Sequence, residues 1–175
     1  MSAKSAAARQ PSKPRFLADA MLGSVARKLR IFGFDTAYLA HTSDDQILKM
    51  GMEQGRTILT ADKEFFKRIV KHGAQGVLVD GSNDLGDLAH ILGKMGITQV
   101  SVALGSRCAS CNGILEDRSK GQVEVPPAVA GRHREFYQCI RCGKVYWEGG
   151  HMKKMRAFAE ALERRLNAGP EASKG

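Results

Sequence analysis

The sequence has no long apolar run. Among its 175 residues, no stretch approaches the ~20 consecutive apolar residues that cross a bilayer as a helix, which excludes a membrane-embedded protein. The first residues lack the apolar core of a secretory signal, and no prenylation or lipid-anchor motif is present, so we expect a cytoplasmic protein. Because 43% of the residues are hydrophobic, a collagen-like or fully disordered chain is excluded as well.

Several common catalytic motifs are also missing. The sequence has no phosphate-binding P-loop, no glycine fingerprint for dinucleotides, no serine nucleophile elbow and no His-Glu-x-x-His segment. These absences exclude the best-known nucleotide-hydrolysing, dinucleotide-dependent, serine-hydrolase and zinc-peptidase mechanisms. Few enzymatic interpretations are left.

Acidic residues are in the minority. The chain has 27 Lys and Arg against 18 Asp and Glu, a net charge of +9, and the excess lies toward its two ends. A basic chain attracts polyanions through counterion release, so nucleic acid is the first partner to consider and an anionic membrane surface the second; the alternative is a merely soluble basic protein. Residues 1–14 are predicted to form a flexible basic tail and residues 168–175 a loose one.

Short apolar or β-branched runs alternate with segments of helical periodicity from Arg15 to Leu104. This alternation predicts an α/β fold over residues 15–104, with a mostly parallel sheet and helices on both faces. Ligands of such sheets collect beyond the carboxyl ends of the strands. Strands are expected at 16–18, 36–39, 57–60, 76–79 and 100–104, and helices at about 21–32, from 43, at 63–72 and at 84–95.

The composition changes at Gly105. Residues 105–150 are rich in Gly, Cys and Arg, and their only β-like runs are short, at 122–125, 136–139 and 144–147. Such a segment has too little apolar area for a large core, so it is predicted to be a small module held together in another way. A closing helix is predicted at 151–167, ended by Gly169-Pro170.

All four cysteines lie in this module, as two Cys-x2-Cys pairs. Four thiolates at this spacing match a tetrahedral zinc with bonds of ~2.3 Å, so a zinc ribbon is predicted over residues 105–150. The alternatives are disulfides, which a reducing cytosol disfavours, and a redox dithiol, which needs only one pair. Four sulfurs complete the coordination sphere, so the zinc is predicted to be structural and neither His133 nor His151 is needed as a ligand. The predicted zinc ligands are Cys108, Cys111, Cys139 and Cys142.

Basic residues surround the predicted ribbon, and Tyr137, Tyr146 and Trp147 lie among them. This mixture suits a nucleic-acid surface with phosphate contacts and base stacking. The alternative is that the aromatic residues pack the ribbon against the rest of the protein. Zinc ribbons bind proteins as well as nucleic acids, so the partner stays open.

Acidic residues follow the ends of the predicted strands. Asp19 comes after the first strand and Asp62 after the third, with Glu64 two positions later, while Asp44 and Asp45 open the second helix. Because parallel strands end at one edge of a sheet, we expect these carboxylates to converge. Carboxylates bind Mg²⁺ or Mn²⁺, ions that activate water and neutralise a leaving oxygen beside a phosphodiester. Helix capping is the alternative for each acid alone, but it does not explain why acids recur at several strand ends.

Basic side chains near these acids are candidates to hold substrate phosphates. They are Arg27 and Arg30 on the first predicted helix and Arg68 on the third, for which a solvated helix face is the alternative. Asp80, at the end of the fourth strand, is better explained as a turn residue.

Several blocks of the sequence form a distinctive combination. They are Phe16–Gly23, Ala26–Arg30 and Gly33–Thr36, then Ser43–Asp45 and Gly55–Asp62, and finally Arg107–Gly113 and Cys139–His151. Over about residues 15–155 this combination resembles the Mut-seven carboxy-terminal RNase family, a branch of the PIN-like nucleases.

The resemblance implies a PIN-like three-layer fold and metal-dependent cleavage of phosphodiester bonds, with RNA as the substrate. Asp19 matches the first acid of PIN-like nucleases, Asp44 the helical acid and Asp62 the aspartate of the Thr-x-Asp block. Glu64 stands where relatives often have a further acid, and Asp45 is the alternative to Asp44 as a ligand. The longer helical insert that carries another glutamate in many PIN domains is missing, which implies one tightly held ion and a second recruited by the substrate.

The sequence therefore predicts a metal-dependent ribonuclease. In this hypothesis Asp19, Asp44 and Asp62 hold Mg²⁺ or Mn²⁺, and a structural zinc ribbon aids the binding of RNA or a protein partner. Two other hypotheses stay open. One is a non-catalytic RNA- or ribosome-binding zinc-ribbon protein, and the other is a toxin-like PIN nuclease controlled by a regulatory protein.

Overall fold

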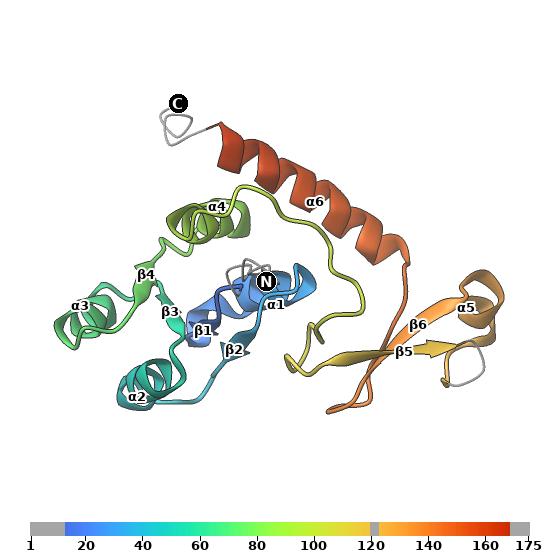
Figure 1. Ribbon diagram of the computed structural model, residues 1–175, viewed down its shortest axis with the longest axis horizontal. Coiled ribbons are helices and arrows are strands. Elements are labelled where there is room, and N and C mark those ends of the chain that lie inside the picture. The colour runs from blue at the N-terminus through green and yellow to red at the C-terminus, as the bar shows by residue number, and fades with distance from the viewer. Residues whose placement is uncertain (1–12, 120–122, 169–175) are drawn as a thin grey trace, which may run out of the picture.

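A computed structural model describes residues 13–119 and 123–168 of the chain (Figure 1). Most of the predicted N-terminal tail, nearly all of the predicted C-terminal tail and Gln122 lie outside these residues. The first part of the chain contains β1 (Phe16–Ala18), the 3-10 helix η1 (Ala20–Leu22), α1 (Gly23–Ile31), β2 (Thr36–Tyr38), α2 (Asp44–Gln54), β3 (Thr57–Thr60), α3 (Lys63–Lys71), β4 (Gly76–Leu78) and α4 (Asp84–Lys94). The second part contains β5 (Leu115–Ser119), α5 (Pro127–Arg132), β6 (Glu135–Cys139), β7 (Val145–Tyr146) and α6 (Gly150–Asn167).

The central sheet has four parallel strands in the order β2-β1-β3-β4. Successive residues of a strand face opposite sides of the sheet. Phe16 and Ala18 of β1 accordingly belong to the core beneath α1 and α4, whereas Leu17 of the same strand and Ile58 of β3 belong to the core beneath α2 and α3. Figure 1 shows these two helix pairs on the two faces. The predicted α/β class with a three-layer arrangement and a parallel sheet is confirmed.

Local sequence signals explain why α2 begins and ends where it does. Ser43 is the N-cap and forms a capping box with Gln46, so that Asp44 and Asp45 occupy the first turn. Gly55 follows the helix with a φ of 58°, a left-handed conformation that glycine adopts without strain. The position of Asp44 and Asp45 is therefore set by a cap in which neither takes part.

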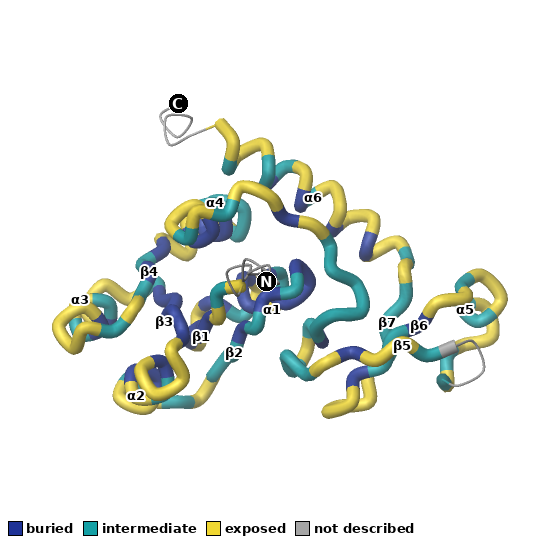
Figure 2. Tube along the Cα trace, viewed as in Figure 1, coloured by how far each residue is buried: buried dark blue, intermediate teal, exposed yellow. Residues whose placement is uncertain are grey.

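The last helix, α6, follows the cysteine-containing module in sequence but packs on the α/β part. Met152, Met155, Ala159 and Leu162 are buried in the same core cluster as the inner face of α1 and α4. Figure 2 shows buried positions of α6 on the side that faces these helices. The chain thus returns to the first core after forming the module, which ties the two parts together through apolar contacts.

The fifth predicted strand is absent from the described residues. Residues 100–104 form no strand and instead run between α1 and α6: Val100 N–H donates to Glu163 Oε1 at 2.8 Å, and Ala103 N–H donates to the Ile31 carbonyl at 2.9 Å. Val100 itself is buried in the helical core. A β-branched run signals an extended, buried segment, but it does not show whether the segment's backbone groups bond to a sheet or to helices.

The second part of the chain is built on an antiparallel sheet in the order β5-β6-β7. The short strands predicted near 136–139 and 144–147 correspond to β6 and β7, but the one predicted at 122–125 is wrong, because residues 123–125 form no strand and β5 lies earlier. Three of the five residues of β5, Glu116, Asp117 and Arg118, are charged. A strand of this composition shows no apolar pattern, so its position was missed.

Candidate functional site

The carboxyl edge of the parallel sheet brings Asp19 next to the end of β3. Asp19 N–H donates to the Leu59 carbonyl at 3.1 Å, so Asp19 continues the pairing of β1 with β3 by one residue. Asp62 follows β3 by two residues, and its own N–H donates to Thr60 Oγ1 at 3.0 Å. The first and third predicted acids therefore lie at the ends of adjacent strands.

Asp19 and Asp62 both cap helices through a single carboxylate oxygen. Oδ1 of Asp19 accepts the Met21 N–H at 3.0 Å, and Oδ1 of Asp62 accepts the N–H groups of Glu64 and Phe65 at 2.7 and 3.0 Å. The Oδ2 atoms have no hydrogen-bond partner within the part of the chain that the structure describes. Capping and metal binding are thus compatible, because each needs a different oxygen of the same carboxylate.

The acids at the start of α2 are paired with one arginine of α3. Arg68 Nη1 lies 3.1 Å from Asp44 Oδ2, and Arg68 Nη2 also contacts Asp45 Oδ1. The Asp44 side chain is 47% exposed and that of Asp45 84%, so Asp44 is the more enclosed of the two candidates. Arg68 therefore offsets one of the two negative charges of this pair and lies next to the predicted site.

Glu64 is placed differently from the other acids. It lies in the first turn of α3, its side chain is 78% exposed, and it pairs with Lys67 at 2.7 Å. Because one helical turn separates the two residues, this is a local surface pair. The structure does not bring Glu64 into contact with Asp19 or Asp44.

The aspartates do not form a closed cluster. Among residues 13–119 and 123–168, the one group of three or more His, Cys, Asp or Glu residues with ligand atoms all within 4.8 Å of one another is the four cysteines. Mg²⁺ keeps several waters and is usually held by one or two carboxylates plus substrate phosphates. The acids along the carboxyl edge suit such an open site in chemistry, and their convergence on one ion stays a prediction.

Further acids near β4 serve the fold. Asp80 Oδ1 accepts the Ser82 N–H at 2.8 Å, the turn that the sequence suggests, and Asp84 pairs with Lys28 of α1. Asp87 is buried on α4, where burial and the neighbouring Asp80 and Asp84 raise its pKa, while its Oδ1 accepts the Gly81 N–H at 3.3 Å. Sequence reasoning missed Asp87, although its place beside Leu88 and Ile91 on the apolar side of α4 is an unusual position for an acid.

The four cysteines fit a tetrahedral zinc ion. Cys108 Sγ lies 3.6 Å from Cys142 Sγ, and Cys111 Sγ lies 3.5 Å from Cys139 Sγ. All four are free thiols. A tetrahedral ion with Zn–S bonds of ~2.3 Å places its sulfurs about 3.8 Å apart, which is close to these distances. The predicted four-cysteine cluster is therefore present with spacings that suit zinc.

Backbone N–H groups point at the sulfurs of Cys108 and Cys139, and such hydrogen bonds favour a thiolate. Cys108 Sγ accepts the N–H of Cys111 at 3.4 Å and contacts the Tyr146 hydroxyl at 3.0 Å, while Cys139 Sγ accepts the N–H of Arg141 and of Cys142. Burial raises the pKa of Cys108, but these hydrogen bonds outweigh it and lower the pKa to about 6. Zinc binds thiolates, so Cys108 is prepared for the metal, whereas burial and the neighbouring thiols raise the pKa of Cys111 and of Cys142.

The first cysteine pair docks on the amino edge of the parallel sheet. Arg30 of α1 is buried, donates from Nε to the Thr36 carbonyl at 2.8 Å, and donates from Nη1 to the carbonyls of Ala109 and Ser110 at 3.1 and 2.9 Å. This placement gives Arg30 a role in the fold, and the substrate-binding role predicted for it stays a prediction. Its Nε and Nη1 donors are taken by backbone carbonyls, so through these atoms Arg30 ties the module to the sheet.

A second set of contacts, which we call the amino-edge junction, consists of Asp35, Arg56, Arg107 and Asn112. Asp35 Oδ1 accepts from Arg56 Nη1 and from Asn112 Nδ2, both at 2.8 Å, and Arg107 Nη2 lies 3.5 Å from Asp35 Oδ2. Asn112 Oδ1 in turn accepts the Thr36 N–H at 3.0 Å. Strands of three or four residues, at ~3.3 Å per residue, separate this junction from the acids by roughly 10 Å. The cysteine cluster and the acids thus lie at opposite edges of the sheet.

The model of the Mut7-C RNAse domain family matches residues 14–159, a range that includes the candidate acids of the carboxyl edge and all four cysteines. The chain belongs to this family. The resemblance stated from the sequence blocks is thereby confirmed. A search of curated proteins and a search of solved structures each find no match. Among the helices in residues 13–119 and 123–168, none has the length and apolarity needed to cross a membrane.

In this Mut7-C chain, Asp35→Ala is expected to lower the free energy of unfolding by about 2–4 kcal/mol. The substitution leaves the nearly buried Arg56 without its carboxylate, and removing one member of a buried pair is costly. Denaturant unfolding measures the effect. The matched control is Glu53→Ala, which breaks an exposed pair with Lys49 and is expected to change stability by less than about 0.5 kcal/mol. Equal losses in the two variants would show that the junction does not stabilise the fold.

The same carboxylate contributes a pH dependence. Burial opposes ionisation of Asp35, but hydrogen bonds from Arg56 and Asn112 and the nearby charges outweigh it, so that its pKa is lowered. A lowered pKa means that the stabilisation is present above the ordinary pKa of an unfolded aspartate and is lost as the pH falls through the folded value. We expect that in Asp35→Asn the free energy of unfolding, measured against pH, falls less steeply on the acid side than in the wild type.

Two of the aromatic residues in the predicted ribbon of this Mut7-C chain pack against the cysteine cluster. Tyr137 and Tyr146 are cross-strand neighbours on β6 and β7 and lie against the cysteine cluster. A Cβ at Gly105, whose φ is 88°, would come within 2.5 Å of the Tyr137 ring, so the ring packs on bare backbone there. Trp147 lies near His133, with ring centroids 6.5 Å apart. For the two tyrosines, packing is the observed role.

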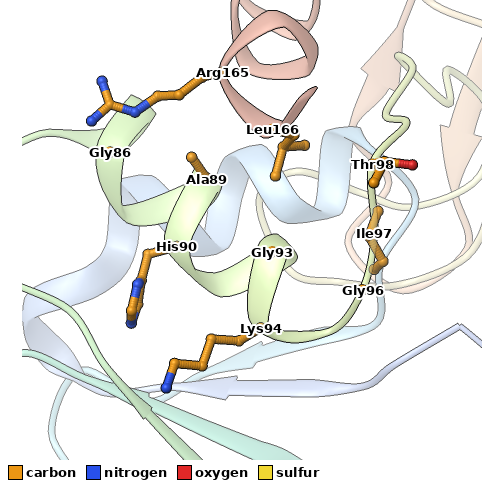
Figure 3. A pocket seen from close by; sticks show the side chains of 10 residues that line it. All are labelled: Gly86, Ala89, His90, Gly93, Lys94, Gly96, Ile97, Thr98, Arg165 and Leu166. Carbon is orange, nitrogen blue, oxygen red and sulfur yellow. The ribbon is translucent and has the colours of Figure 1, made fainter. Parts of the chain in front are cut away.

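A cavity of about 570 Å³ lies between α4 and the end of α6 (Figure 3). Gly86, Ala89 and Gly93 of α4 form one wall, and Leu166 of α6 faces them. None of the predicted catalytic, substrate-binding or metal-binding residues lines it. The cavity follows from small residues at a helix contact, and we assign no chemistry to it.

Proposed function

We propose that this chain is a metal-dependent ribonuclease whose site is the carboxyl edge of the parallel sheet. The observation that carries the proposal is the pair Asp19 and Asp62, which lie at the ends of adjacent strands and each keep one carboxylate oxygen free while the other caps a helix. Membership of the Mut7-C RNAse domain family supports RNA as the substrate.

Asp19 and Asp62 would hold Mg²⁺ or Mn²⁺ through Oδ2, and Asp44 would complete the site, with Asp45 as the alternative ligand. A bound divalent ion activates a water molecule and neutralises charge on the phosphodiester. The protein supplies the positions: strand pairing fixes Asp19 beside β3, and the cap of α3 fixes the Asp62 side chain. Rigid elements that set ligand positions favour a reactive geometry.

Arg68 would bind the substrate phosphate beside the ion. In the structure it pairs with both Asp44 and Asp45, and a cation arriving at Asp44 would compete for the same carboxylate. The released guanidinium could then form charge-assisted hydrogen bonds to a phosphate, for which its planar fork is suited. Arg27 is the other candidate for substrate binding, at a place described below.

The zinc ribbon would support recognition and stability, away from the chemistry. Four thiolates close the coordination sphere of zinc, so no position is left for a water or substrate. A reducing compartment such as the cytoplasm would keep these thiols available to the metal. RNA is the partner we propose, and a ribosomal or regulatory protein is the alternative partner for the ribbon.

The test is cleavage of labelled single-stranded and structured RNA by zinc-loaded protein. The protein is dialysed free of Mg²⁺ and Mn²⁺, and each ion is then titrated back. A general chelator is not a suitable blank, because it also removes zinc from the thiolates. We expect saturable cleavage that requires the added ion, at unchanged zinc content.

Retained RNA binding without cleavage at any ion concentration would contradict the nuclease and favour the non-catalytic RNA-binding protein. Cleavage that persists with no divalent ion other than zinc would contradict the role proposed for the aspartates. Activity that appears only after removal of a copurified protein would favour the toxin-like nuclease under a regulatory partner.

A further inference from the structure

A second cavity, of about 260 Å³, lies where α1, the zinc-binding module and the start of α6 meet. Ile31, Leu115 and Met152 line it and are each less than one-tenth exposed, so its interior is apolar. Arg27 and Lys144, both exposed, lie at its rim. An apolar interior with a few polar groups is the general character of small-ligand sites.

The charged residues of this cavity are of one sign. Arg27, Arg107, Lys144 and His151 line it, and no acidic residue is among its lining residues, all of which the structure describes. Arg107 is partly compensated by Asp35. Lys144 donates to the neutral Ser110 hydroxyl at 2.9 Å, and Arg27 has no hydrogen bond or ion pair within the described residues. Two positive charges are therefore left for an anionic ligand.

The zinc cluster nearby does not cancel this charge. Zinc with four thiolates carries two negative charges, but cations surround it. Arg30 and Arg141 donate to backbone carbonyls of the first cysteine pair, those of Ala109, Ser110 and Cys111. These two cations match the two negative charges of the cluster, so the charges of Arg27 and Lys144 are left over and we expect the potential at the cavity to be positive.

We propose that this cavity binds one nucleotide of an RNA strand, with the phosphate at Arg27 and Lys144 and the base over the apolar wall. This step rests on the proposed function in taking RNA as the ligand. The volume is slightly below the ~300–1,000 Å³ of sites for drug-sized ligands, which suits a single nucleotide unit. A bare phosphate would leave the apolar wall unused, and an apolar ligand would leave the cations without a partner.

The position of Arg27 connects the cavity with the acids. α1 begins at Gly23, directly after the 3-10 helix that Asp19 caps, and Arg27 lies about one turn or 6 Å further along the axis. An RNA strand with one nucleotide bound in the cavity can follow α1 toward the carboxyl edge of the sheet. The cavity then acts as an anchor that fixes which phosphodiester reaches the aspartates.

The first experiment locates the ligand on zinc-loaded protein without Mg²⁺ or Mn²⁺, so that nothing is cleaved. Uridine 5′-monophosphate is titrated, and the methyl signals of Ile31, Leu115 and Met152 are followed by NMR. We expect these signals to shift with uridine monophosphate, and inorganic phosphate to bind at least about tenfold more weakly. Shifts confined to other residues, or equal binding of the two probes, would overturn the nucleotide assignment; equal binding indicates an anion site only.

The second experiment measures labelled single-stranded RNA by fluorescence polarisation with exposed charge-reversal variants. Arg27→Glu and Lys144→Glu are each expected to weaken binding about tenfold and to reduce the salt slope by about 0.7 for each lost phosphate contact. Lys49→Glu, at an exposed position of α2 outside the cavity, is the matched control and is expected to change affinity less than about twofold. Zinc content is measured for each variant, because Lys144 is close to Cys142 in sequence.

Equal affinities of the three variants would overturn the cavity as an RNA site. Both experiments are independent of catalysis, so nucleotide binding in the cavity without ion-dependent cleavage would keep the anchor and remove only the proposed nuclease. Cleavage without nucleotide binding in the cavity would do the reverse.

Discussion

Replacing Asp19 or Asp62 with asparagine is expected to lower ion-dependent RNA cleavage by about 10³-fold while the protein stays folded. A bound ion contributes several kcal/mol of charge stabilisation in the transition state, and ~1.4 kcal/mol corresponds to a tenfold change in rate. Asparagine keeps an oxygen that can accept the capping N–H groups and ranks with aspartate as an N-cap. The substitution therefore separates the two roles of the carboxylate, since only the ion loses a charged ligand.

The measurement combines initial cleavage rates over a range of Mn²⁺ concentrations with thermal unfolding of each variant. Asp117→Asn, on β5 of the ribbon, is the matched control and is expected to cleave at the wild-type rate. Wild-type rates in both Asp19→Asn and Asp62→Asn would show that the carboxyl edge is not the catalytic site. A large loss of thermal stability would show instead that the capping role requires the full charge.

The positions of these acids could be predicted because two short-range signals coincide. The apolar runs at 16–18 and 57–60 mark β1 and β3 without error, and the residues that follow must turn the chain toward a helix. Parallel pairing then places both strand ends at the same edge, whatever the remaining details of the fold. Asp19 and Asp62 follow from this reasoning alone.

The partners of the charged side chains could not be predicted in the same way. Arg30 and Arg27 lie one turn apart on α1, yet Arg30 is buried against the carbonyls of Ala109 and Ser110, whereas Arg27 is exposed at a cavity. The difference depends on where the cysteine-containing module docks, which involves residues 79 and 80 positions away in the chain. Helical periodicity shows that a face is buried but not which element covers it.

The sequence also did not predict correctly whether segments 100–104 and 115–119 form strands. Residues 100–104 have the composition of a strand, but the N–H groups of Val100 and Ala103 bond to α6 and α1, while the charged segment 115–119 pairs with β6. In both cases the backbone partner decides the structure. Strand propensity reflects the surface against which a segment packs, and that surface forms only in the folded protein.

Cys142→Ser is expected to abolish tight zinc binding and to lower the melting temperature by about 10 °C or more. Cys142 is exposed, so the substitution removes a metal ligand and creates no buried cavity. Structural zinc sites contribute on the order of 10 kcal/mol to the folding of their modules, and a few kcal/mol of this would reach the rest of the protein through Arg30 and Asn112. Zinc content and thermal unfolding measure the effect, and Ile140→Ser, at an exposed position within the same cysteine pair, is the control.

Amide hydrogen exchange shows which parts of the sheet lose protection when zinc is lost. In Cys142→Ser the Thr36 N–H, which donates to Asn112 Oδ1, is expected to exchange much faster, whereas the Val79 N–H, which donates to the Thr60 carbonyl at the other edge, is expected to keep its protection. Unchanged exchange at Thr36 would contradict the coupling between the cluster and the sheet.

Because the acids lie beside Thr60 and the cavity lies beside the cysteine cluster, the Cys142→Ser variant should retain ion-dependent cleavage at saturating RNA and bind RNA more weakly. Equal losses in cleavage rate and in RNA affinity would mean that the loss of zinc disturbs both edges of the sheet.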